Sequence, residues 1–438
     1  MINYEKVGLV PKLKSIFSYL CTSKYTGLYI AILGLLLSLL FVLMVYPRIA
    51  DTYNAVLDTD RYGALGFGLW KNGSLSYYPD LQSTVNRGPV YPLFMATMLK
   101  VSNGWWPMSV QIAQCLLFSL TCFLVFWTAK TMWNQMVGLF VSLCCAVHPF
   151  LIWYTSRIWV ETQATLLFTA LVAGVLYFSL KPSLYRAVLV GILLAVASLC
   201  KQTFMPYMVI IPFLLAVLKG GQGRWRISAC IFATAVILVS PWTLRNYGLT
   251  GRVIPVHLLA GFNFQVGDSF IDNFAGSPFS YAGLWLKGFK KVIDIEDEQD
   301  LRAMKLSDQE VVLDDVYLNA SLKRYLSEPE FLARKIIYNL GLYWTLGETK
   351  LKSAVISCMQ LPLLLLFICS TILILRRYGI RSIQAIPVIM VCCYCGFHLP
   401  IFAFARLSVV LIPTMLVVSG SLFGYCRLAE PSGSDNVA

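Results

Sequence analysis

Long runs of apolar residues, separated by polar stretches, dominate the sequence. A helix that spans a bilayer needs about 20 mostly apolar residues, and about ten runs approach that length. The pattern therefore predicts an all-α polytopic membrane protein. We expect its spans at Thr26–Tyr46, Met108–Trp127, Met136–Trp153, Ile158–Leu180, Ala187–Leu199, Phe204–Leu218, Ile227–Leu244, Ala354–Leu375, Ile383–Leu399 and Leu407–Tyr425.

Two polar segments between these runs are too long to be simple connections. The first lies between spans one and two, and the second between spans seven and eight. We expect both on the outer side of the membrane. The resulting organisation is an N-terminal segment over 1–25, spans one to seven over 26–244 with the first outer loop at 47–107, a long outer segment over 245–353, three spans over 354–426 and a tail over 427–438.

Two amphipathic helices are predicted in the second outer segment. Apolar residues recur at helical spacing over Val311–Tyr325. Ser327 precedes Pro329 and Glu330, a pattern typical of a helix N-cap. We expect the helix that follows, Glu328–Tyr343, to lie on the outer membrane surface.

The basic residues give the orientation of the spans. They are concentrated in alternate short loops, which is the positive-inside pattern of membrane proteins. With the N-terminus inside, about ten spans place both termini in the cytoplasm. The basic residues of the expected inner loops are Lys130, Lys181, Arg186, Lys219, Arg224, Arg226, Arg376, Arg377, Arg381 and Arg427.

Composition agrees with this class. Charged residues make up 13% of the chain and hydrophobic residues 58%, whereas soluble domains carry about 25% charged residues. The net charge of +13 could indicate nucleic-acid binding, but topology explains the basic loops better. Cys392 and Cys395 form a CxxC spacing. Inside an apolar run, this pair favours packing over metal or redox chemistry.

Candidate chemistry begins directly after the first span. Asp58 and Tyr62 are four residues apart and would share one face of a short helix. Such an aspartate could be a general base for a hydroxyl or the N-cap of the helix, and spacing leaves both open. Asp58 and Asp60 also form a DxD triplet, which can hold a divalent cation beside phosphates. A cation there is the only cofactor that the sequence suggests.

Arg87 and Glu161 are candidates for the same outer level of the membrane. Arg87 precedes the turn-forming run Gly-Pro-Val-Tyr-Pro and could bind a phosphate or extend to lipid headgroups. Glu161 lies near the outer end of the fourth span. A carboxylate at membrane depth is usually functional or ion-paired, and Arg157 is its expected helical partner.

Further polar residues lie at the outer ends of other spans. Arg245 and Asn246 follow the seventh span, and His398 and Arg406 lie between the last two. The three histidines, His148, His257 and His398, are far apart and lack metal-ligand spacing. Each is expected to be structural.

Together these features resemble the GT-C glycosyltransferases, the group that includes the aminoarabinose transferase of lipid A and the protein O-mannosyltransferases. The order of the motifs and their topological placement carry the resemblance, which extends to about Gly420. The motifs are Asp58, Arg61 and Tyr62; Arg87, Pro89, Tyr91 and Pro92; Glu161; Pro241, Trp242, Arg245 and Asn246; and Arg406.

The resemblance implies sugar transfer from a polyprenyl-phosphate donor at the outer face of the membrane. It assigns Asp58 as the catalytic aspartate and Arg87 as the residue that contacts the lipid phosphate. Gly88 replaces a common proline, and Lys201 replaces a common arginine. We therefore expect Asp58 and Asp60 to be catalytic, Arg87, Arg245 and Arg406 to bind phosphate, and Tyr62, Glu161, Lys201, Asn246 and His398 to line the substrate cavity.

The sequence thus predicts an inner-membrane glycosyltransferase with its site facing the periplasm or outside. It would transfer sugar to a protein, lipid or glycan acceptor by inverting displacement, without nucleic acid as a partner. A transporter or lipid flippase is the alternative from another class, but it would favour internal repeats and polar residues at mid-membrane. An O-antigen polymerase or ligase is the alternative among enzymes, and the early position of Asp58 argues against it.

Overall fold

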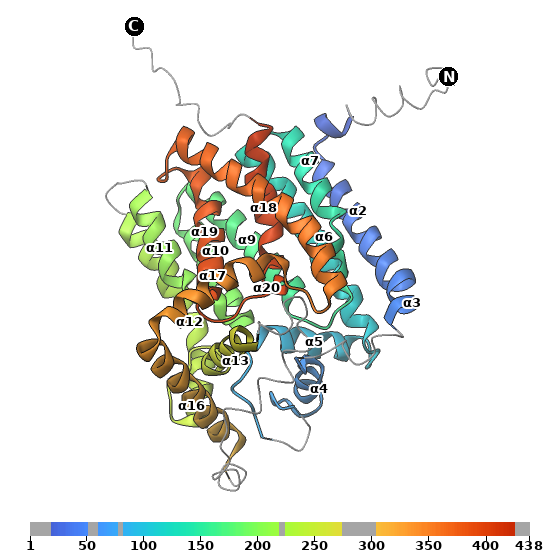
Figure 1. Cartoon of the computed structure of the whole chain (residues 1–438). Helices are drawn as coiled ribbons and strands as arrows, with labels where there is room; N and C mark the ends of the chain where they lie inside the picture. Colours follow the sequence, from blue (N-terminus) through green and yellow to red (C-terminus); the bar gives the residue numbers. More distant parts are fainter. Residues whose placement is uncertain (1–18, 51–59, 78–81, 219–223, 274–303, 425–438) are drawn as a thin grey trace.

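The computed structural model describes residues 19–50, 60–77, 82–218, 224–273 and 304–424 (Figure 1). These residues form helices and irregular segments, without a β-strand. The helices are α2 (Thr26–Leu40), α3 (Tyr46–Ala50), α4 (Tyr62–Asn72), α5 (Val90–Val101), α6 (Met108–Met132), α7 (Gln135–Ala146), α8 (Pro149–Thr155), α9 (Glu161–Leu180), α10 (Leu184–Cys200), α11 (Tyr207–Leu218), α12 (Arg224–Thr250), α13 (Ala260–Asn273), α16 (Leu306–Ser327), α17 (Pro329–Thr345), α18 (Lys350–Tyr378), α19 (Ile386–His398), α20 (Ala405–Ser408) and α21 (Ile412–Ser419).

The all-α membrane fold is confirmed, but the count of ten spans is not. Among the described residues, six helices are long and apolar enough to cross a bilayer, or seven if the bent pair α7 and α8 is one span. The pair bends by 54° at His148, just before Pro149. The expected spans at Ala187–Leu199, Phe204–Leu218 and Ile383–Leu399 are helical but shorter than a full span. An apolar run predicts a buried or lipid-facing helix, and its length alone does not show that the helix crosses the bilayer.

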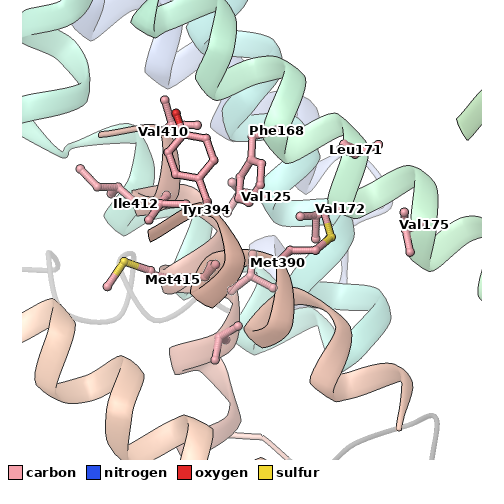
Figure 2. Close-up of a cluster of buried hydrophobic side chains, with 14 of the residues drawn as sticks. Val125, Phe168, Leu171, Val172, Val175, Met390, Tyr394, Val410, Ile412 and Met415 are labelled. Carbon is pink, nitrogen blue, oxygen red and sulfur yellow. The ribbon is translucent and has the colours of Figure 1, made fainter. Parts of the chain in front are cut away.

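The membrane-embedded core lies between α6, α9, α19 and α21. Figure 2 shows Phe168 and Val172 of α9 close to Met390 and Tyr394 of α19. Small residues bring the peripheral helix α2 close to α6, because a Cβ on Gly27 would lie 2.7 Å from the ring of Phe126. Close backbone approach of this kind is the usual way in which membrane helices pack.

The second long polar segment is helical in the two predicted places, with one boundary different. Val311–Tyr325 lies within α16. The N-cap prediction for Ser327 is wrong, because Ser327 is the last residue of α16 and its hydroxyl donates to the carbonyls of Lys323 and Arg324. Glu328 separates the two helices, and Pro329 begins α17. The proline supplies the break, since its ring cannot continue the preceding helix.

A buried polar network fastens α13, α16 and α17 to one another. Lys335 Nζ lies 2.6 Å from Asp268 Oδ1 and donates to the Tyr325 hydroxyl at 2.8 Å. Ser321 donates to the other oxygen of Asp268 at 2.6 Å. Burial lowers the pKa of Lys335 to about 8, although Asp268 opposes the shift. Because every member has a partner, the network gives the arrangement of these three helices a defined structure.

Different segments of the chain lie at the two ends of the helical bundle. At one end, Gln135 at the start of α7 donates to the carbonyl of Ser23, just before α2, at 2.8 Å. At the other end lie α4, α5, α13 and α16 (Figure 1). The two long polar segments of the sequence therefore meet at a single end of the bundle.

Candidate active site

A turn with a strained backbone at Arg61 precedes α4. Arg61 has a left-handed backbone with φ of 56°, and α4 begins at the next residue, Tyr62. The helix that was expected to carry Asp58 and Tyr62 on one face therefore does not extend back to Asp60. Asp58 itself lies outside the described residues, and its predicted catalytic role stays a prediction. A non-glycine residue in this conformation costs free energy and is often found at functional sites.

A cluster of two acids and two bases, with Glu161 fully buried and the other three partly buried, lies directly beyond this turn. Glu161 is the first residue of α9 and forms an ion pair with Arg406 of α20. Arg406 Nε lies 2.8 Å from Glu161 Oε1. The same guanidinium donates to Asp60. Lys201, after α10, lies 3.7 Å from Glu161 Oε1. Arg406 therefore joins the segment before α4 to the start of α9.

Glu161 was expected to pair with Arg157, and this prediction is wrong as a helical pair. α9 begins at Glu161, so Arg157 belongs to the turn before the helix. Its guanidinium lies 4.4 Å from the ring centre of Trp159, and that of Arg406 lies 4.0 Å from the same ring. Two arginines thus stack near one tryptophan, and Glu161 balances the charge of Arg406.

Arg87 faces this cluster from the turn before α5. Its guanidinium lies 5.6 Å from the ring centre of Tyr62, which in turn packs edge-on against Tyr91 at 4.9 Å. The neighbouring Gly88 has no room for a side chain, because a Cβ would lie 2.1 Å from the carbonyl oxygen of Leu199. Glycine at this position therefore allows the turn to pack directly on the end of α10.

Arg245 and Asn246 brace the backbone around Arg87. Arg245 donates to the carbonyl of Thr84 at 2.9 Å, and Asn246 donates to the carbonyls of Ile254 and Val256 at 3.0 Å each. From α16, Glu310 accepts hydrogen bonds from the Thr84 hydroxyl and the Val85 amide. Through its hydrogen bond to Thr84, Arg245 stabilises the backbone of the segment before Arg87. Its predicted phosphate contact stays a prediction.

His398 lies in an aromatic environment at the end of α19. Its Nδ1 is 2.8 Å from the carbonyl oxygen of Tyr394, and its ring lies between Tyr394 at 4.8 Å and Tyr343 at 5.6 Å. His257, which the sequence marked only as structural, is brought near Arg87 and Lys201. Burial and then the charges of those two residues lower the pKa of His257 to about 3. No sequence signal marks it, because its neighbours come from distant segments.

Comparisons with known proteins identify the fold that carries this site. Residues 86–244 match the family model described as dolichyl-phosphate-mannose-protein mannosyltransferase. The structure matches that of the archaeal oligosaccharyltransferase AglB from Archaeoglobus fulgidus, in complex with an inhibitory peptide and a dolichol-phosphate, with a TM-score of 0.55 at 12% identity. The chain has a GT-C fold. This confirms the resemblance that the sequence motifs indicated.

This chain covers only part of the length of each matched structure. The AglB match covers 91% of this chain and 50% of that one, so the chain spans about half the length of AglB. The apo form of the same oligosaccharyltransferase gives a TM-score of 0.53, also at 12% identity, over 91% of this chain and 50% of that one. ArnT from Cupriavidus metallidurans bound to undecaprenyl phosphate gives 0.42 at 12% identity, over 92% and 78%. Comparison with curated proteins gives no match.

Within this GT-C fold, Asp60 is held as a carboxylate. Burial by itself raises its pKa, but the charges of Arg406 and Arg87 outweigh that effect and lower the pKa below its usual value. Asp60 therefore stays ionised at neutral pH and remains a partner of Arg406. In the described structure Asp60 contacts Arg406, and its predicted catalytic role stays a prediction.

The divalent cation predicted at Asp58 and Asp60 stays a prediction, because Asp58 lies outside the described residues. Arg406 lies between the carboxylates of Asp60 and Glu161, so a guanidinium engages both of these acids. In the part of the chain that the structure describes, no three acidic, histidine or cysteine side chains gather as metal ligands.

Proposed function

We propose that the protein transfers a sugar from a polyprenyl-phosphate donor to an acceptor outside the cytoplasm. One observation carries the proposal: within a GT-C fold, Asp60, Glu161, Arg406 and Lys201 form a buried charge cluster, with Arg87 beside it, at a single end of the bundle. The complex of AglB with dolichol-phosphate supports a lipid-linked phosphate as the ligand of such a site. The acceptor is a protein, a lipid or a glycan.

The reaction that we propose is an inverting displacement at the anomeric carbon. The acceptor oxygen or nitrogen forms a bond to that carbon as the bond from the carbon to the phosphate oxygen breaks. The proton of the acceptor passes to Asp58, and the bonding electrons leave with the polyprenyl phosphate. Loss of a general base typically slows such a step by about 10²–10⁴-fold.

Cationic side chains would stabilise the leaving phosphate. Preorganised positive groups are worth most where negative charge develops in a site shielded from water. Arg87 suits this role because its guanidinium can donate two parallel hydrogen bonds to a phosphate. Glu161 would shape the cavity, and Arg406 would hold Glu161 and Asp60 in place.

The proposed location is the inner membrane, with the site on the outer side. Basic residues at the far end of the bundle support this orientation, since positive loops favour the cytoplasm. Lys130 at the end of α6 and Arg376 and Arg377 at the end of α18 are examples. A lipid-linked donor also requires a site at membrane depth, because its tail stays in the bilayer.

Donor binding tests the proposal directly. We expect the purified protein in lipid nanodiscs to bind undecaprenyl phosphate, and Arg87→Ala and Arg87→Lys both to bind it at least about ten-fold more weakly. Lysine keeps the charge but loses the two parallel hydrogen bonds. Arg252→Ala is the control, because Arg252 is 55% exposed and pairs with Asp315.

The outcomes are distinct. A wild-type protein that does not bind undecaprenyl phosphate contradicts the proposed function. Wild-type affinity in Arg87→Lys, together with weak binding in Arg87→Ala, means that charge alone suffices at this position. Unchanged affinity in both variants moves the phosphate contact away from Arg87.

A further inference from the structure

Three distant segments of the chain meet at Gly88. A Cβ on Gly88 would lie 2.1 Å from the carbonyl oxygen of Leu199 and 3.4 Å from Cγ1 of Val256. The amide of Leu258 also donates to the carbonyl of Val85 at 3.0 Å. The contacts therefore bring the turn before α5, the end of α10 and the segment before α13 together.

Each of these segments carries a nitrogen-bearing side chain next to the contact. Arg87 precedes Gly88, Lys201 is two residues after Leu199, and His257 follows Val256. Their proximity is also seen electrostatically, because the charges of Arg87 and Lys201 add to burial in lowering the pKa of His257. The three side chains thus belong to one location, although the sequence separates them widely.

The side-chain nitrogens of Arg87, Lys201 and His257 have few hydrogen-bond partners among the described residues. Lys201 Nζ and His257 Nδ1 are buried without a hydrogen-bond partner among the described residues. The contact of Lys201 with Glu161, at 3.7 Å, is too long for a hydrogen bond. Arg87 donates only to the carbonyl of its neighbour Asn86 within the described part of the chain. Buried polar groups are normally satisfied, so each such group requires an explanation.

The nearby acids do not supply the missing partners. Asp60 and Glu161 are both engaged by Arg406. The oxygens of Glu310 accept from the Thr84 hydroxyl and the Val85 amide. An additional anion would therefore find two cations and an imidazole whose hydrogen-bonding capacity is unused.

We propose that Arg87, Lys201 and His257 form one anion-binding site for the phosphate of a polyprenyl phosphate, with His257 as its third hydrogen-bond donor. This inference rests on the proposed function, since it names residues that hold the same donor. A phosphate has several acceptor oxygens and can receive all three side chains at once. At neutral pH the lowered pKa of His257 keeps its imidazole neutral, and a neutral imidazole offers one N–H.

Histidine spectroscopy provides a test that a merely structural role would not pass. The chain has three histidines, so protein labelled with ¹⁵N-histidine gives a simple spectrum. His257→Gln assigns one set of signals, and His148→Gln is the matched control because His148 Nδ1 is also buried without a partner in the described structure. The ligands are undecaprenyl phosphate, undecaprenol and inorganic phosphate, each added to nanodiscs.

We expect undecaprenyl phosphate to shift the His257 signals and undecaprenol to leave them unchanged. His257→Gln should weaken binding by about 10–100-fold, as expected for one hydrogen bond to a charged group, whereas His148→Gln should bind normally. A shift with inorganic phosphate as well supports the same site and shows that it recognises the phosphate without the tail. If His257→Gln does not fold, His148→Gln and His398→Gln assign the signals of the other two histidines, and the remaining set belongs to His257.

The contrary outcomes separate this inference from the proposed function. Normal binding of undecaprenyl phosphate with unmoved His257 signals would overturn the three-residue site and leave the donor proposal intact. Absence of binding to the wild-type protein would overturn the proposed function itself.

Discussion

The substitution Glu161→Gln tests the structural importance of the buried charge cluster. Glutamine keeps the size of the side chain and one accepting oxygen, but it removes the negative charge and replaces the second oxygen with an NH2 donor. Glu161 is 2% exposed, and its partners Arg406 and Lys201 are 12% and 14% exposed. The two cations would therefore lose an acid that water cannot replace.

The expected loss of stability follows from this burial. Removing one partner of a buried ion pair costs about 3–5 kcal/mol. Unfolding entropy near 2.1 cal/mol/K per residue gives about 0.9 kcal/mol/K for 438 residues, so the Tm should fall by about 3–5 °C. The matched control is Asp315→Asn, whose partner Arg252 is 55% exposed. Exposed pairs are worth about 0–1 kcal/mol, so its Tm should change by about 1 °C or less.

The assay is thermal unfolding in lipid nanodiscs, followed by a thiol-reactive dye. Cys115, Cys122 and Cys145 are buried and become reactive only as the helices separate. We expect Glu161→Gln to unfold several degrees below both the wild type and Asp315→Asn. If the two variants unfold at the same temperature, the cluster does not hold the end of the bundle together, and the reasoning is refuted.

Three further predictions concern the surroundings of the cluster. Gly88→Ala should reduce sugar transfer by about 10²-fold or more, because its Cβ would displace the turn that carries Arg87. Gly248→Ala is the control and should transfer sugar normally, because no atom lies close to Gly248. Equal transfer rates in the two variants would refute the close packing at Gly88. The pKa of Asp60 is lowered in the folded protein, so the ionised carboxylate should stabilise the fold above about pH 4 and lose this effect as the pH falls further. The Tm difference between the wild type and Asp60→Asn should therefore shrink below that pH. A Tm difference that does not change with pH would contradict the ion pair. Transfer should survive treatment with EDTA, and activity that is lost and then restored by Mg²⁺ or Mn²⁺ would place a cation at the Asp58 and Asp60 triplet.

The sequence predicts those parts of the structure that depend on local pattern. Apolar runs mark the helices, and Glu161 lies at one end of a span, as expected, because it begins α9. The helix over Val311–Tyr325 follows from its periodicity. The error at Ser327 is also local, because a serine before a proline can end one helix as readily as it can begin the next.

The parts that the sequence does not predict depend on contacts between distant residues. Arg406 and Asp60 are separated by 346 positions, and no local signal shows that they pair. Arg157 looked like the partner of Glu161 only on the assumption that one helix contains both. The position of His257 follows from the packing of Gly88 on Leu199, which requires the complete fold.

The proposed transfer reaction is tested most directly by mass spectrometry of envelope glycans and lipid-linked sugars. The comparison uses cells that express the wild-type protein, Asp58→Asn or no copy of the gene, with membrane levels of the two proteins matched. The proposed mechanism predicts that one sugar is missing from an envelope glycan or protein in the Asp58→Asn and gene-free cells, while its polyprenyl-phosphate form accumulates in both. Identical glycans and unchanged lipid-linked sugars in all three cell lines would contradict it.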